Sequence, residues 1–191
     1  IGDLNIPNHP ETVYLSVVDK DLNSVSIINS VCYAFGSGIT TEKTAIILQN
    51  RGTNFRIEEG HPNCIEGLKR PLHTIIPGMV LDENGECFLS YGVMGGQYQA
   101  AGHAYVLSQM IDFGLSPQQA LDFPRVFPNN NILDFENKFD KDVIVDLALR
   151  GHEINYPAPL IGGGQIILID NNRDVLIGAS DWRKDGFAIG Y

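Results

Sequence analysis

The chain has 191 residues, of which 43% are hydrophobic and 19% charged, which is the usage of a globular domain and argues against disorder. A chain of this length can bury roughly 70% of its extended surface, so it can hold a core of its own. Lys and Arg number 13 against 23 Asp and Glu, and the net charge of −10 repels nucleic-acid phosphates. We therefore expect no nucleic-acid partner and, since no apolar run nears the ~20 residues of a bilayer span, no membrane span.

The cysteines and histidines do not form a metal-binding pattern. The three cysteines are scattered and odd in number, and the five histidines are dispersed, without a Cys-x-x-Cys pair or a zinc-type spacing. We expect neither a metal nor a cofactor. The cysteines are also too few for a disulfide framework, which slightly favours a reducing compartment. We therefore slightly prefer a cytoplasmic location.

The first predicted elements form a hairpin. Residues 1–11 are predicted to be irregular, because Pro7 and Pro10 interrupt both helix and strand. Segments 12–19 and 23–30 are rich in β-branched and aromatic residues and flank a short turn. They predict two antiparallel strands.

The short turn suggests how the two strands pair. If the residues that flank the turn face each other, Tyr14 faces Ile28 and Thr12 faces Ser30. A slip by one residue would turn these side chains to opposite faces. The pairing of Thr12 with Ser30 is therefore a hypothesis.

The rest of the chain predicts strands, then helices, then strands again. Residues 50–71 read as a polar loop. Further strands are expected over residues 44–49, 74–81, 87–94, 166–169 and 175–179, and helices over 97–113, 116–123 and 141–149. This order is typical of an α+β fold with a largely antiparallel sheet.

Thr12 is a candidate nucleophile. A hydroxyl needs a base to take its proton, and a threonine at the start of its chain can use its own α-amine. Glu11 precedes Thr12, so the bond between them would have to be cut. The alternative is a threonine that begins a strand because β-branched residues favour strands.

Gly95 and Gly96 lie between an apolar strand and a predicted helix. Their backbone N–H groups can approach a ligand closely and hold a developing oxyanion, although a tight strand-to-helix turn would look the same. Ser30, in the predicted register, could orient the hydroxyl or amine of Thr12, or could be a solvated strand residue. The glycine spacing matches no nucleotide-binding motif.

Taken together, these segments resemble the small-subunit region of the gamma-glutamyltransferase (gamma-glutamyltranspeptidase) family. The resemblance runs from Thr12 to Tyr191 and is specific in the order of its motifs. The matching stretches are Thr-Val-Tyr-Leu-Ser-Val-Val-Asp-Lys-Asp, Phe-Gly-Ser-Gly-Ile, Leu-Gln-Asn-Arg-Gly, Gly-His-Pro-Asn, Lys-Arg-Pro-Leu-His-Thr, Met-Gly-Gly and the ending Gly-Ala-Ser-Asp…Gly-Tyr.

The resemblance implies an Ntn-hydrolase fold, an αββα sandwich with two largely antiparallel sheets. It implies self-cleavage of a precursor, so that residues 1–11 end a large subunit and residues 12–191 form the catalytic small subunit. Thr12 would be the nucleophile, Ser30 a neighbouring hydroxyl, and Gly95 with Gly96 the oxyanion glycines. The partner would be the large subunit of the same precursor, in a heterodimer or a higher oligomer.

This sequence departs from the transpeptidases where they hold the α-ammonium and α-carboxylate of a glutamyl group. Positions that carry Asn, Gln and Asp for the ammonium are Cys32, Arg51 and Asn54 here, so a carboxylate is lost and a cation gained. The Ser-Ser pair for the carboxylate is His73-Thr74, and the loop that covers the substrate looks short. These changes resemble the gamma-glutamyltransferase-like or cephalosporin-acylase-like branch.

We expect an amidohydrolase or acyltransferase that acts on gamma-glutamyl or related acidic acyl amides, with an acyl group that lacks the ammonium suiting Arg51 better and with hydrolysis favoured over transfer. One alternative is true gamma-glutamyl transfer from glutathione-type substrates, with the ammonium bound by other groups. The other alternative is an unprocessed homologue without catalysis, in which the Glu11–Thr12 bond stays intact.

Overall fold

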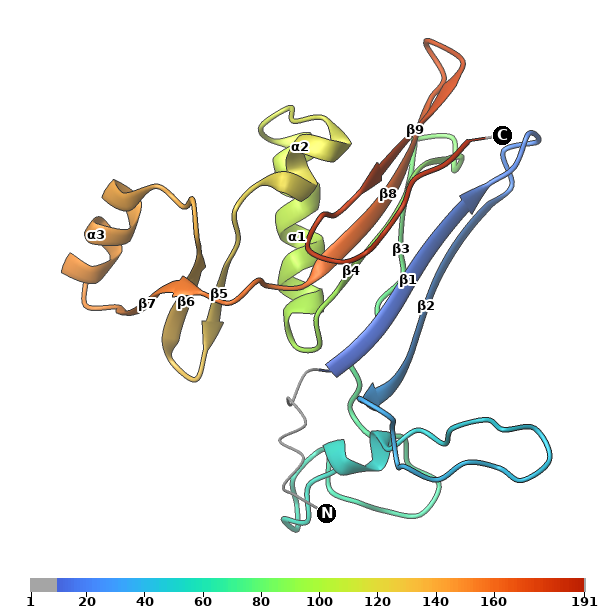
Figure 1. Ribbon diagram of the computed structural model, residues 1–191, viewed down its shortest axis with the longest axis vertical. Helices are drawn as coiled ribbons and strands as arrows, with labels where there is room; N and C mark the ends of the chain where they lie inside the picture. Colours follow the sequence, from blue (N-terminus) through green and yellow to red (C-terminus); the bar gives the residue numbers. More distant parts are fainter. Residues whose placement is uncertain (1–9, 191) are drawn as a thin grey trace.

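The computed structural model describes residues 10–190, so most of the predicted segment 1–11 lies outside the described residues. Within that range the chain forms nine β-strands, three α-helices and one short 3-10 helix. The strands form three sheets of two, four and three strands, which Figure 1 shows with the helices beside them. The predicted α+β class, with largely antiparallel sheets, is confirmed.

The two-stranded sheet is the predicted hairpin. Strands β1 (Pro10–Val18) and β2 (Ser24–Tyr33) are antiparallel, and Tyr14 lies opposite Ile28 as expected. Strand β1 begins two residues before the predicted start, so Pro10 does not interrupt it. Over residues 12–18 of β1, half-buried and buried side chains alternate with exposed ones, which is the pattern of a strand that packs on one face only.

The four-stranded sheet is the centre of the molecule. Its order is β3-β4-β8-β9, and every neighbouring pair is antiparallel. Helices α1 and α2 lie against one face of this sheet and the β1–β2 hairpin lies against the other (Figure 1). The elements are β3 (Gly78–Leu81), β4 (Cys87–Met94), β8 (Gly163–Asp170), β9 (Val175–Ser180), α1 (Tyr98–Ile111) and α2 (Pro117–Asp122).

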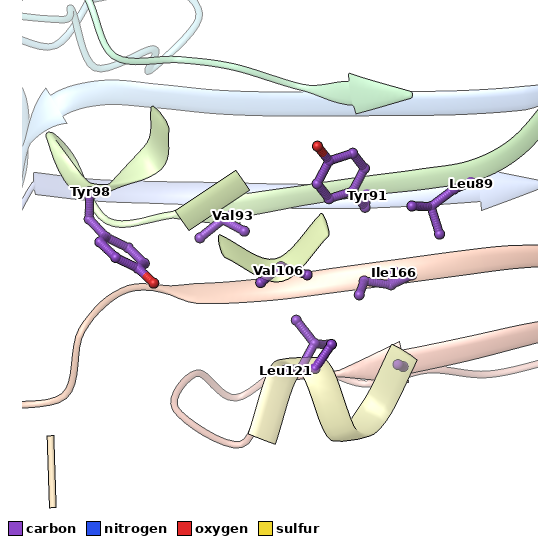
Figure 2. Close-up of a cluster of buried hydrophobic side chains, with 9 residues drawn as sticks. Leu89, Tyr91, Val93, Tyr98, Val106, Leu121 and Ile166 are labelled. Atoms are coloured by element: carbon purple, nitrogen blue, oxygen red, sulfur yellow. The ribbon is translucent and has the colours of Figure 1, made fainter. Parts of the chain in front are cut away.

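The hydrophobic core fills the space between this sheet and the helices. Alternate residues of β4 point to the helical side, where they meet side chains of α1 and α2 (Figure 2). Full burial of each such side chain contributes about 1.5–3 kcal/mol. The fully buried members include Leu89, Val93, Val106 and Leu121. This core fixes β4, and with it the turn that follows β4.

The helices agree with their sequence signals. Ser116 caps α2 and forms a reciprocal capping box with Gln119, with Pro117 at the first helical position. Helix α3 (Lys141–Leu149) has the predicted bounds, and α1 is slightly shorter than predicted. Across residues 10–190 the model contains no helix with the length and apolar character that crossing a membrane requires.

The third sheet was not predicted. Strands β5 (Val126–Asn129), β6 (Ile132–Glu136) and β7 (Glu153–Ala158) form it, and β6 and β7 are parallel, with α3 between them in the chain. A two-residue loop, Asn130-Asn131, joins β5 to β6 with both residues at positive φ. This is the geometry of a tight hairpin, which asparagine tolerates better than most residues.

The predicted strand over residues 44–49 is wrong. Only a single bridge between Thr40 and Ile47 forms there, and Ala45 has a positive φ of 54°. The predicted strand 74–81 is confirmed only over β3. Most of the chain between β2 and β3 is loop, with one 3-10 helix η1 (Arg51–Asn54).

Candidate active site

A β-bulge places Thr12 opposite two residues of β2. The predicted register holds as far as the pair Val13–Asn29 and then shifts, so that Thr12 lies opposite both Ser30 and Val31. Bulges bend a strand and re-aim its side chains, and they are frequent beside active sites. Thr12 and Ser30 therefore face each other across the strands as predicted, but Thr12 also faces Val31.

Hydrogen bonds hold the bulge in shape. Cys32 is buried and has a φ of 81°, and its N–H donates to Ser30 Oγ over 3.0 Å. Asn50 accepts a hydrogen bond from the N–H of Tyr33 over 3.2 Å, and its own N–H donates to the carbonyl of Val31. These contacts attach the loop that carries η1 to the bulge.

Strand β1 packs on β4 in regular steps. The hydroxyl of Ser16 donates to Ser90 Oγ over 2.6 Å, and two residues back along β1 the ring of Tyr14 lies on Gly92. The strands run in opposite directions, so a step of two residues down β1 is a step of two residues up β4. Thr12 is the next residue on the same face of β1, two residues before Tyr14, and a further step of the same size along β4 would end at Met94, next to the turn.

The turn after β4 is Gly95-Gly96. Both residues have positive φ, 129° and 58°, and their carbonyls accept the N–H groups of Tyr98 and Gln99 at the start of α1. Within residues 10–190 neither glycine N–H donates to another residue. A Cβ on Gly95 would lie 2.8 Å from the Cα of Gly162, so this backbone approach requires glycine.

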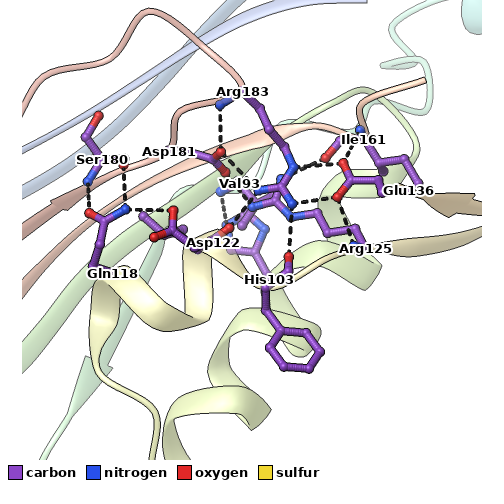
Figure 3. A network of polar contacts seen from close by, with 12 residues as sticks. Val93, His103, Gln118, Asp122, Arg125, Glu136, Ile161, Ser180, Asp181 and Arg183 are labelled. Carbon is purple, nitrogen blue, oxygen red and sulfur yellow. Dashed lines mark hydrogen bonds and ion pairs between the residues drawn. The ribbon is translucent and has the colours of Figure 1, made fainter. Parts of the chain in front are cut away.

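A buried ion network supports the strand that contacts this turn (Figure 3). Arg125 donates to the carbonyl of Ile161 over 2.7 Å, and the N–H of Ile161 donates to Glu136 over 2.7 Å. Arg183 pairs with Glu136, and Arg125 pairs with Asp181, each at 2.5 Å. Burial alone would raise the pKa of Glu136, but hydrogen bonds from Arg183 and backbone N–H groups outweigh it and hold the pKa below its ordinary value.

The predicted substrate-binding residues lie in the loop between β2 and β3. Asn54 Nδ2 donates to the carbonyl of Leu72 over 3.0 Å, which ties η1 to the segment that contains His73 and Thr74. One guanidinium nitrogen of Arg51 is shut off from solvent and has no hydrogen-bond partner within the described residues. A buried cation nitrogen without a partner is costly unless an anion joins it.

The same loop returns to the start of α1. The N–H of Ile76 donates to Gln99 Oε1 over 3.3 Å, one turn from the diglycine. The loop is therefore tied at one end to the bulge at Thr12 and at the other to the helix behind the glycines. Thr12, Ser30 and Cys32 belong to the bulge, and Arg51 and Asn54 to the loop attached to it.

His103 was not singled out by sequence reasoning, although it faces the end of β4. Its Nδ1 lies 2.6 Å from the carbonyl of Gln99 and its Nε2 accepts the N–H of Val93 over 3.3 Å. This pattern is that of a neutral ring protonated on Nδ1, and burial lowers the pKa of His103. Within residues 10–190 no group of three or more His, Cys, Asp or Glu is placed to hold a metal ion.

The fold and the family match define the class to which the protein belongs. An α+β fold with largely antiparallel sheets is the architecture expected of an Ntn hydrolase. The family model for gamma-glutamyltranspeptidase matches residues 2–191. The chain belongs to the gamma-glutamyltranspeptidase family.

Three relatives show the range of activities within this family. The chain is 36% identical to "Glutathione hydrolase-like YwrD proenzyme" of Bacillus subtilis, over 100% of this chain and 38% of that protein. It is 30% identical to "Oxamate amidohydrolase proenzyme" of Klebsiella pneumoniae, over 95% of this chain and 36% of that protein. The crystal structure of cephalosporin acylase from Bacillus halodurans matches with a TM-score of 0.85 and 40% identity, over 96% of this chain and 36% of that chain. The chain thus spans little more than a third of the length of these relatives.

Proposed function

We propose that the protein is an amidohydrolase or acyltransferase whose nucleophile is Thr12, freed by cleavage of the Glu11–Thr12 bond. The observation that supports this proposal is the packing of β1 on β4, in which Ser16 meets Ser90 and Tyr14 lies on Gly92, so that the same spacing would bring Thr12 to the diglycine turn. In this arrangement the hydroxyl of Thr12 and the amine that cleavage would create would face two backbone N–H groups that have no acceptor within residues 10–190.

The chemistry follows from these groups. The free amine of Thr12 takes the hydroxyl proton as the oxygen attacks the amide carbonyl of the substrate. The N–H groups of Gly95 and Gly96 hold the developing oxyanion, and Ser30 orients the nucleophile. The amine of the substrate leaves with the proton, and water or an acceptor amine releases the acyl group from the Thr12 ester.

We propose that the small subunit, residues 12–191, works with a large subunit whose end is residues 1–11. The outer face of the β1–β2 hairpin supports a partner, because five apolar side chains there are 44–64% exposed: Val13, Leu15, Val17, Val25 and Ile27. Two of the relatives are called proenzymes. A heterodimer of the two subunits, alone or in a higher oligomer, would cover this face.

The substrate we propose is an amide of a small acid that carries a terminal carboxylate and no α-ammonium. One guanidinium nitrogen of Arg51 has no hydrogen-bond partner in the described part of the chain, which favours an anion at this place. A substrate ammonium ~4 Å from this guanidinium would be repelled by about 4 kcal/mol at an effective dielectric constant of 20. Oxamate, which one relative's name gives as its substrate, is an acid amide of this kind.

A second candidate function is gamma-glutamyl transfer from glutathione-type donors, which the name of another relative favours. Turnover of glutaryl anilide and gamma-glutamyl anilide separates the two functions. We expect the glutaryl compound to be turned over faster, since it lacks the ammonium. A strong preference for the gamma-glutamyl anilide would refute the acyl-group proposal and leave the Thr12 proposal standing.

The Thr12→Ala variant of the full-length precursor tests the nucleophile. We expect the wild-type precursor to appear as two chains on a denaturing gel and to hydrolyse anilides. The variant should stay as one chain and lose hydrolysis, whereas Thr12→Ser should keep a measurable part of both. An uncut wild type without hydrolysis would instead favour the unprocessed, non-catalytic homologue.

A further inference from the structure

We propose that a small group of residues between the hairpin and β4 sets the position of Thr12 over the diglycine turn. The inference rests on the proposed function and names residues that act by positioning Thr12. We call this group the register lock. It consists of Tyr14 and Ser16 of β1, Ser26 of β2, and Ser90 and Gly92 of β4.

The first half of the register lock is steric. Tyr14 is 4% exposed and its ring lies flat on Gly92, where a Cβ would be 2.6 Å from the ring carbon Cγ and would overlap two further ring atoms. A Cβ atom essentially never lies under 3.0 Å from a ring carbon, so the site accepts only glycine beneath the ring. The ring of Tyr14 therefore fits over Gly92 in only one alignment of β1 with β4.

The second half of the register lock is a chain of hydroxyls. Tyr14 Oη lies 2.7 Å from Ser26 Oγ, which donates to the carbonyl of Gly78 over 2.9 Å. On the neighbouring position Ser16 donates to Ser90 Oγ over 2.6 Å, and Ser90 donates to the carbonyl of Val25 over 3.4 Å. Each hydroxyl therefore has an acceptor, and the chain links both strands of the hairpin to β3 and β4.

These directional contacts specify an alignment that an apolar interface would not. A slide of β1 by two residues would move Thr12 by ~6.8 Å and place the Tyr14 ring over Ser90 or beyond Gly92. Smaller shifts matter too, because a misplacement of ~1 Å of a reacting group can lower a rate ~100-fold. The two β1 members of the register lock, Tyr14 and Ser16, lie two and four residues from Thr12 on the strand that carries it.

The register lock is separate from the hydrophobic core. Leu89, Tyr91 and Val93 of β4 point to the helical side of the sheet, whereas Ser90 and Gly92 point to the hairpin. A change at Gly92 therefore disturbs the hairpin and leaves the packing of α1 and α2 on the sheet in place. This separation allows a clean test.

The test is Gly92→Ala in the full-length precursor. The added methyl lifts β1 from β4, so we expect kcat for glutaryl anilide to fall ~100-fold while KM changes less than twofold. Self-cleavage at Glu11–Thr12 should slow as well, because it uses the same hydroxyl. Hydrogen exchange should become faster at the amides of β1 and stay slow at those of β4 and β8.

Two further variants separate positioning from lost stability. Gly164→Ala adds the same methyl to the neighbouring strand β8 on the helical face, where it meets the end of Leu121 at 2.8 Å. We expect this variant to lower the free energy of unfolding but to keep kcat within threefold. In the double variant Tyr14→Leu with Gly92→Ala, the smaller side chain vacates the space that the methyl needs, and kcat should recover at least tenfold over Gly92→Ala.

The outcomes are distinguishable. A wild type that cleaves and hydrolyses, with a Gly92→Ala variant that loses no more kcat than Gly164→Ala, would overturn the register lock alone. The register lock would also be overturned if the double variant Tyr14→Leu with Gly92→Ala did not recover kcat over Gly92→Ala. A wild type that neither cleaves nor hydrolyses would overturn the proposed function, and the register lock as a positioning device with it.

Discussion

At the scale of single residues, Arg51 carries the proposed choice of substrate. Within residues 10–190 one of its guanidinium nitrogens is buried without a hydrogen-bond partner, and we propose that the charge of Arg51 attracts the substrate carboxylate. We expect Arg51→Gln to lower the ratio of glutaryl to gamma-glutamyl anilide turnover at least tenfold, which corresponds to about 1.4 kcal/mol. Arg56→Gln, an exposed arginine of the same loop, should leave the ratio unchanged. An equal ratio in both variants would remove Arg51 from substrate recognition.

The pairing of β1 with β2 was predictable from the sequence only in part. The pairing of Tyr14 with Ile28 followed from turn length and strand pattern, and it is confirmed. The bulge at Thr12 did not follow, because it depends on a positive φ at Cys32, and cysteine gives no signal for that conformation. The roles of Thr12 and of the diglycine came from family resemblance and stay predictions.

At the scale of elements, His103 joins α1 to β4 through two hydrogen bonds that need a neutral ring. Its pKa is lowered mainly by burial, so as pH falls below about 6.5 the unfolded chain takes up the proton first and stability is lost. Each pH unit below that value, down to the folded pKa, costs about 1.4 kcal/mol.

We therefore expect His103→Gln to reduce the loss of stability between pH 7 and 5.5 in denaturant unfolding, whatever its effect at pH 7. His152→Gln, at an exposed position, should keep the slope of the wild type. If the unfolding free energy of His103→Gln fell with pH as steeply as that of the wild type, His103 would not be the group that makes stability depend on pH.

Elements were misread where tertiary contacts override local preference. Residues 44–49 are apolar and β-branched, yet no neighbouring strand pairs with them beyond one bridge, and Ile46 and Leu48 stay exposed. Strands β5 and β7 contain Pro128 and Pro157, which local rules read as breakers, but both belong to a small sheet. Helices, whose caps are local, were predicted almost to the residue.

At the scale of the whole molecule, the buried ion network connects segments that are far apart in sequence. Arg125 and Arg183 balance Glu136 and Asp181 in charge, and all four are buried. Arg183 also donates to carbonyls at the end of α2. A buried pair contributes little over an apolar core, but removal of one partner leaves an uncompensated charge.

We expect Glu136→Gln to destabilise the protein by about 3–5 kcal/mol, measured by denaturant unfolding at pH 7. Asp146→Asn, which breaks an exposed pair with Arg150, should cost less than ~1 kcal/mol. Because the pKa of Glu136 is lowered, its stabilisation is present at neutral pH and is lost as pH falls through the folded pKa. A loss for Glu136→Gln as small as for Asp146→Asn would show that the network is not a structural anchor.

The most direct measurement of the central claim is the location of the acyl group during turnover. The purified full-length protein would be mixed with glutaryl anilide, quenched in acid, digested and mapped by mass spectrometry. We predict an acyl group on a peptide that begins at Thr12, with Glu11 absent from its amino end. An acyl group on another residue, or turnover by chains in which Glu11 is still bonded to Thr12, would contradict the account.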